Sequence, residues 1–139
     1  MSRTFYHATD CVFEKFDPAR QGTKGASNGH LGVWVATVRE GCEMFGDVLM
    51  TLSVPEASAY PMDLSDIYDM HVKASRMDDD EAAAYYEDFA ADLMAAGYNV
   101  IDINERGAVC HCILLDFDNI VIESCEVLEK ASPSTWGKP

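Results

Sequence analysis

Residues 99–116, NVIDINERGAVCHCILLD, have the pattern of two β-strands joined by a tight turn. The segments from Asn99 to Ile103 and from Cys110 to Leu115 are rich in β-branched and other apolar side chains, which favours strands. The intervening NERGA contains Gly107, a residue that tolerates the backbone conformations of short turns. We therefore expect a hairpin near the end of the chain.

The triplet Cys110-His111-Cys112 within this hairpin could suggest a metal site or an activated thiol. Neighbouring side chains of a strand point to opposite faces, so the two cysteines share one face and His111 occupies the other. Two thiols are too few for a structural zinc site, and the other cysteines and histidines stand singly in the sequence. We interpret both cysteines as core residues and predict no metal site. A hydrolase that pairs a cysteine with a distant histidine stays open as an alternative.

The clearest helix is predicted from Asp78 to Ala96. Tyr85, Phe89 and Leu93 recur every fourth residue and form an apolar face, with Tyr86, Ala90 and Met94 beside it. The run Asp78-Asp79-Asp80 offers capping oxygens and favourable charge at the helix start, which we prefer to a metal-site interpretation. Gly97 suits a left-handed cap at its end.

Strand signals occur on both sides of this helix, which is typical of an α+β domain. We expect one domain over residues 1–130 and a flexible tail over 131–139. The segment 59–72 mixes turn and apolar residues and is assigned only loosely. The other expected elements are strands at 4–9, 33–37 and 48–54, one or two short strands from 120–122 and 125–128, a loop at 21–32 and a short helix at 39–45.

The charge of the chain limits its partners. Its 139 residues include 24 acidic and 10 basic side chains, a net charge of −14. A field of this sign repels nucleic-acid phosphate, so we expect no direct nucleic-acid binding. It suits a basic protein partner, or a protein that imitates nucleic acid, although good solubility alone would also account for it.

The sequence carries no sign of a membrane or of secretion. No apolar run is long enough to span a bilayer, and the start MSRTFYHATD lacks the apolar centre of a signal peptide. The five cysteines are odd in number and irregularly spaced, which favours reduced thiols. We expect a cytoplasmic protein.

Four motifs in order along the chain resemble the ADP-ribosyltransferase fold, and its small phage and mobile-element members in particular. The resemblance covers residues 4–54 and 97–123. The matching motifs are Tyr6-His7-Ala8-Thr9, the Phe-x-x-Phe-Asp stretch at 13–17, Gly32-Val33-Trp34-Val35-Ala36-Thr37, and the pair formed by 97–101 with 111–117.

This resemblance implies split antiparallel β-sheets around a cleft for NAD, with one main helix. His7 would hold the ribose beside the nicotinamide, and Trp34 would stack on the nicotinamide where the family has tyrosine. Thr9 and backbone groups around Ala8 and Gly32 would contact the cofactor. Purely structural roles, a satisfied histidine and a core aromatic, are the alternatives for His7 and Trp34.

The third signature position of the family is a carboxylate, and here it is His111. The carboxylate stabilises the positive sugar as nicotinamide leaves, and such electrostatic stabilisation is commonly the largest catalytic contribution. A neutral imidazole can accept a hydrogen bond or act as a base, but it supplies no fixed negative charge. Glu105, in the turn of the hairpin, is the nearest acid that could compensate.

The resemblance thus implies an NAD-dependent ADP-ribosyltransferase that modifies a macromolecule, which we expect to be a protein. Phage members of the fold can disarm host defence proteins, including CRISPR machinery, and would act in the host cytoplasm. The alternative is a catalytically inactive member, an acidic binding protein or nucleic-acid mimic that blocks a basic partner.

Overall fold

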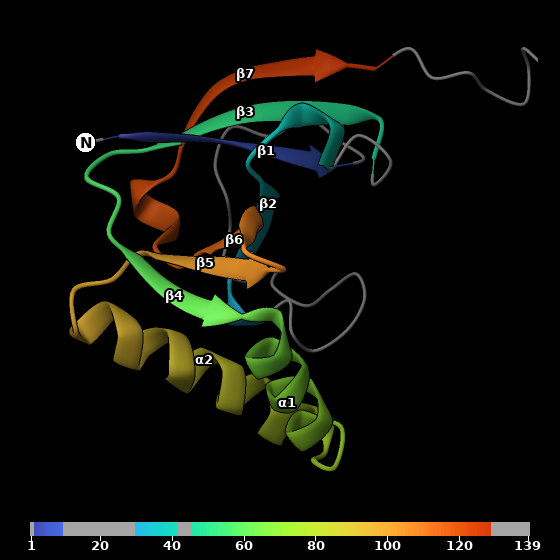
Figure 1. The fold of residues 1–139 in the computed structure, drawn as a ribbon, viewed down its shortest axis with the longest axis vertical. Coiled ribbons are helices and arrows are strands. Elements are labelled where there is room, and N and C mark those ends of the chain that lie inside the picture. The colour runs from blue at the N-terminus through green and yellow to red at the C-terminus, as the bar shows by residue number, and fades with distance from the viewer. Residues whose placement is uncertain (1, 10–29, 42–45, 129–139) are drawn as a thin grey trace, which may run out of the picture.

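The structure, a computed structural model, describes residues 2–9, 30–41 and 46–128. These residues form one seven-stranded mixed sheet with two α-helices packed against part of it (Figure 1). The strands follow the order β4-β5-β6-β2-β1-β3-β7. Their bounds are β1 Arg3–Thr9, β2 Val33–Ala36, β3 Val48–Val54, β4 Ala59–Asp63, β5 Val100–Glu105, β6 Ala108–Leu114 and β7 Val121–Val127, and those of the helices are α1 Leu64–Ala74 and α2 Asp79–Ala95.

The two helices belong to the connection between β4 and β5. These two strands are parallel, whereas every other neighbouring pair of the sheet is antiparallel. A parallel pair requires a long crossover, and α1 with α2 supplies it. Figure 1 shows both helices beside β4 and β5, while β1, β3 and β7 lie at the opposite end of the molecule. The helical layer therefore covers only one part of the sheet.

The sheet is bent so that strands from its two parts share one core. Phe5 of β1, Leu52 of β3 and Leu114 of β6 belong to the same buried cluster, although β2 separates β6 from β1 in the sheet. Arg3 Nη1 of β1 also lies 2.8 Å from Asp102 Oδ1 of β5. We call this the inner core.

A second cluster, the helix-side core, lies between the helices and the sheet. Ile67 of α1, Tyr86 of α2 and Ile113 of β6 are buried in it. Helix α2 contributes Ala82, Tyr86, Ala90 and Leu93. The predicted face is confirmed at Leu93, Tyr86 and Ala90, but its centre is shifted, because Tyr85 and Phe89 are only partly buried. Small alanines on the buried face allow the helix to approach the sheet closely.

Both ends of α2 follow the sequence expectation. The side chain of Asp78 accepts a hydrogen bond of 2.8 Å from the backbone N–H of Glu81, which caps the start. Gly97 has a φ of 101°, a left-handed conformation that favours glycine after the last turn.

The α+β prediction is confirmed, but two details of it are wrong. The described residues contain a second helix, α1, which begins in the loosely assigned segment and ends just beyond it, and the sheet includes the parallel β4–β5 pair. The segments 120–122 and 125–128, from which one or two short strands were expected, form one strand, β7. Of the helix expected at 39–45, the structure describes a 3-10 turn at Arg39–Gly41. The predicted loop at 21–32 lies mostly outside the described residues, and the tail at 131–139 lies wholly outside them.

Candidate functional site

Three residues singled out in the sequence lie on three neighbouring strands. His7 is on β1, Trp34 on β2 and His111 on β6. Ala36 of β2 pairs with His111 on one side and with Tyr6, the neighbour of His7, on the other. The Nδ1 atom of His7 is 2.9 Å from the carbonyl oxygen of Trp34. The three residues therefore lie close together in the sheet, but not on one face of it. Trp34 belongs to the helix-side face, whereas His7 pairs with Met50 of the opposite face.

The hydrogen bond to Trp34 defines the chemical state of His7. A carbonyl oxygen can only accept, so Nδ1 carries the proton and Nε2 is the acceptor nitrogen of the neutral ring. Burial lowers the pKa of His7 below its ordinary value of 6.5, and the hydrogen bond to Trp34 opposes this to a lesser extent. His7 is thus a neutral imidazole at pH 7, with the tautomer fixed by the backbone of β2.

Trp34 is half-buried and packs against the helix-side core. This packing gives the indole a structural role that needs no ligand, the alternative considered from the sequence. Its stacking on a nicotinamide stays a prediction.

His111 lies half-buried between β2 and β5, where it pairs with Ala36 and Ile103. Cross-strand partners share a face, so His111 is on the side of Ile103, which belongs to the helix-side core. Cys112, the next residue, is buried in the inner core on the other side. The predicted alternation of His111 and Cys112 is confirmed.

Glu105 lies at the end of β5, two residues beyond the partner of His111. It is exposed and pairs with Ala108 across the turn. Arg106 and Gly107 have φ values of 54° and 85°, as in a two-residue hairpin turn with a positive φ at both central residues. The predicted hairpin is confirmed, and Glu105 belongs to its solvent-facing end.

The remaining predicted cofactor-binding residues have packing roles in the sheet. A Cβ atom at Gly32 would lie 2.4 Å from the carbonyl oxygen of Leu114, so glycine allows β6 to approach. A Cβ atom at Gly46 would lie 2.5 Å from the carbonyl oxygen of Thr9. Ala8 pairs with Leu49 of β3. Contacts of Ala8, Thr9 and Gly32 with NAD stay predictions.

The prediction that both cysteines of the triplet are core residues is wrong for Cys110. Cys112 is fully buried, whereas Cys110 is exposed. The register of β5 with β6 shifts next to Asn104, which pairs with Val109, and the shift leaves Cys110 as the extra residue of a bulge. The carbonyl of Cys110 instead accepts a hydrogen bond from the backbone N–H of Thr37.

A polar network around Cys112 was not anticipated from the sequence. The Cys112 thiol donates to Asp102 Oδ1 at 3.2 Å, and the same oxygen accepts from Arg3. Burial, with the hydrogen bond to Asp102, raises the pKa of Cys112 to about 12, so the thiol is not a nucleophile. The only signal in the sequence was an acidic residue, Asp102, between two buried isoleucines of a strand. Within the described part of the chain, no three potential metal ligands cluster.

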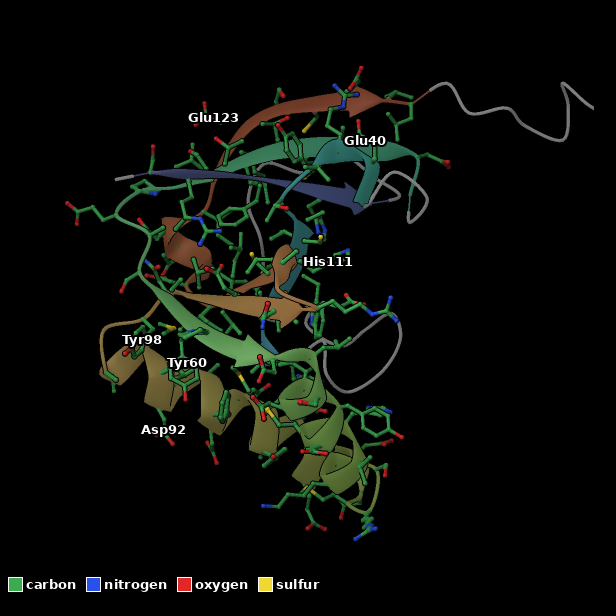
Figure 2. All side chains as sticks on the ribbon, in the orientation of Figure 1. Glu40, Tyr60, Asp92, Tyr98, His111 and Glu123 are labelled. Atoms are coloured by element: carbon green, nitrogen blue, oxygen red, sulfur yellow. The ribbon has the colours of Figure 1, made fainter. Side chains whose placement is uncertain are left out.

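The helical layer, residues 63–96, carries more than half of the net negative charge of the described residues. It contains ten acidic side chains against two basic ones, Lys73 and Arg76, and all ten acids are exposed. Figure 2 shows one of them, Asp92, pointing away from the sheet. No described helix is long and apolar enough to cross a membrane. The ten acids are Asp63, Asp66, Asp69, Asp78, Asp79, Asp80, Glu81, Glu87, Asp88 and Asp92.

Comparison with known proteins gives one distant likeness. No protein-family model matches the chain, and no curated protein matches it. A solved structure described as the crystal structure of an anti-CRISPR protein is similar, with a TM-score of 0.49 and 11% sequence identity. The match covers 92% of this chain and 96% of that one.

Proposed function

We propose that this protein is an acidic binding protein that covers a basic, nucleic-acid-binding surface of a partner protein. The observation that carries the proposal is the helical layer, with ten exposed acids and two bases. Charge of one sign on one layer attracts a surface of the opposite sign over a distance and orients the two proteins as they meet. Host defence proteins are the class of partner that the resemblance of the sequence suggests.

The chemistry around His111 favours binding over catalysis. His7 is held neutral, and the third signature position supplies no fixed negative charge. Trp34 is engaged by the helix-side core. A protein selected for binding would keep the fold but would not need the catalytic carboxylate.

The test is competition with DNA. Purified DNA-binding defence proteins are loaded with labelled duplex, and displacement of the duplex is measured as this protein is added at several salt concentrations. We expect displacement from at least one of them, weakening steeply as salt rises. If no duplex is displaced at any salt concentration, the proposal is wrong.

A matched pair of double variants locates the contact. Asp88→Asn with Asp92→Asn removes two charges from the exposed face of α2, whereas Glu40→Gln with Glu56→Gln removes two charges outside the helical layer. We expect the α2 variant to weaken displacement several-fold more than the other pair. Equal effects would contradict a role for the helical layer.

ADP-ribosyl transfer from NAD to a protein is the second candidate, favoured by the place of His7, Trp34 and His111 on three neighbouring strands. NAD would supply the ADP-ribosyl group, with nicotinamide as leaving group. The neutral Nε2 of His7 would accept a hydrogen bond from a ribose hydroxyl, and Trp34 would stack on the nicotinamide. The fit is incomplete in two ways. His7 pairs with Met50 on the face of the sheet opposite Trp34 and His111, and Glu105 would have to reach in from the turn to supply the missing carboxylate.

Labelled NAD separates the two candidates. The protein is incubated with host extract and labelled NAD beside His7→Ala, His111→Ala and Glu105→Ala, with His71→Ala on α1 as the control. Label transfer that is lost in His7→Ala and kept in the control would support the enzyme. Absence of NAD binding and of transfer, together with DNA displacement, would exclude it. Full activity of Glu105→Ala beside an inactive His111→Ala would exclude the compensating acid.

A further inference from the structure

Two large apolar side chains of α1 face solvent. Leu64 is 43% exposed and Tyr68 is 64% exposed, the second an unusually open position for an aromatic ring on a helix. Residues four apart lie next to each other on one face of a helix, so the two side chains form a continuous apolar strip. The buried residues of α1, Ile67, Met70 and Ala74, lie on another face.

A hollow of about 380 Å³ adjoins this strip. One wall is the start of α1 with Asp63, Leu64 and Ser65, and the other is the β5–β6 turn, residues 104–107. The two walls are joined, because Asn104 Nδ2 donates to Asp63 Oδ1 at 3.1 Å and the two residues pair in the sheet. A hollow built on paired strands and a helix start is present before any partner arrives.

Carboxylates predominate around the hollow and the strip. Asp63 and Glu105 line it and Asp69 follows Tyr68, all three exposed, whereas the lining has one base, Arg106. An apolar and aromatic centre with a charged rim is the usual anatomy of a protein interface, and tyrosine is enriched among the residues that carry its binding energy. The charge of the rim selects a partner segment with arginine or lysine on either side of an apolar residue.

We propose that Leu64, Tyr68 and the adjoining hollow are the centre of the contact with the basic partner. The occupant is a basic segment whose apolar side chain packs on Tyr68 and Leu64 while its cations meet Asp63, Asp69 and Glu105. This inference rests on the proposed function and adds the surface at which the partner is recognised.

The test uses two synthetic peptides of equal length and equal positive charge. One carries phenylalanine between its arginines, and the other carries glycine there. Binding is measured by fluorescence anisotropy at low and at physiological salt. We expect the phenylalanine peptide to bind more tightly, with an advantage that persists at physiological salt because packing is not screened. Amide shifts in NMR spectra should include those of Leu64, Tyr68 and Gly107.

Three variants complete the test. Tyr68→Ala and Leu64→Ala should each remove the advantage of phenylalanine, with a loss of about tenfold for Tyr68→Ala. Met94→Ala, which truncates a 40% exposed side chain on α2, is the matched control and should keep it. Alanine is a strong helix former, so we expect all three variants to fold like the parent protein.

The outcomes separate this inference from the proposed function. If both peptides bind with equal affinity and strong salt dependence, the acidic protein binds basic segments but this contact centre is wrong. If neither peptide binds, this contact centre is wrong, whereas the proposed function is decided separately by the displacement of DNA. If Tyr68→Ala converts a dimer to a monomer in size-exclusion chromatography, the strip is an interface between copies of the chain, and the inference is overturned.

Discussion

The Nδ1 atom of His7 lies 2.9 Å from the carbonyl oxygen of Trp34, and this hydrogen bond links β1 to β2 beside the Tyr6–Ala36 pair. It ties together the two parts of the sheet, β1-β3-β7 and β4-β5-β6 with β2. Both residues therefore help to hold the sheet together, whether or not a ligand is bound.

The first prediction concerns pH. Because burial lowers the pKa of His7, the unfolded chain takes up a proton as pH falls through about 6.5 while the folded protein stays neutral until a lower pH. The unfolded state then binds more protons, so the free energy of unfolding decreases below pH 6.5. His7→Asn keeps a donor for the Trp34 carbonyl but cannot titrate, and it should flatten this decrease in urea titrations.

The exposed His71 of α1 is the matched control. His71→Asn should leave the pH dependence of the unfolding free energy as in the parent protein. A parent protein whose stability does not change between about pH 7 and pH 5 would contradict the assignment of a buried neutral His7.

The second prediction concerns Tyr86 of α2, whose ring is buried in the helix-side core. Its hydroxyl has no hydrogen-bond partner among the described residues, and a buried polar group in that state costs about 1–3 kcal/mol. Tyr86→Phe should therefore leave thermal stability unchanged or raise it, whereas Tyr86→Ala should cost about 3–5 kcal/mol through the cavity it leaves. A clear loss of stability in Tyr86→Phe would show that the hydroxyl is hydrogen-bonded.

The third prediction concerns thiol reactivity. Cys112 is fully buried with its pKa raised to about 12, while Cys110 and Cys125 are exposed. Only thiolates alkylate readily, so iodoacetamide near pH 8 should label Cys110 and Cys125 of the folded protein and spare Cys112. Peptide mass spectrometry reads out each site, and Cys112 should react once urea is added. Labelling of Cys112 at the rate of Cys125 would contradict its burial.

The fourth prediction compares two ion pairs. Arg3–Asp102 is partly buried, with side chains 34% and 23% exposed, and it links strands that are not neighbours. Arg39–Glu126 is about half exposed. Asp102→Asn should lower the unfolding free energy by about 1–3 kcal/mol because Arg3 and Cys112 lose a charged acceptor, whereas Glu126→Gln should cost less than about 1 kcal/mol. Equal losses of unfolding free energy for the two variants in chemical denaturation would contradict a role for Asp102 in holding the inner core together.

Local pattern in the sequence determined the elements with strong periodicity. Helix α2, its Asp78 cap, Gly97 and the hairpin around Gly107 depend on interactions between residues close in the chain, so their signals are complete in short windows. The segment that forms β4 and α1 carries a weaker sequence signal, because Pro61 lies inside the strand and the helix begins directly after Asp63. β4 is at the edge of the sheet, where proline is tolerated.

Contacts between distant segments were decided only by the tertiary structure. Strict alternation predicted two buried cysteines, but the bulge at Cys110 depends on how β6 pairs with β5 and β2, and this exposes one of them. The network of Arg3, Asp102 and Cys112 and the hollow between α1 and the β5–β6 turn likewise join residues far apart in the chain. The concentration of acids in residues 63–96 is present in the sequence, whereas their exposure was decided by folding, because packing Ile67, Tyr86 and their neighbours inward left the carboxylates outside.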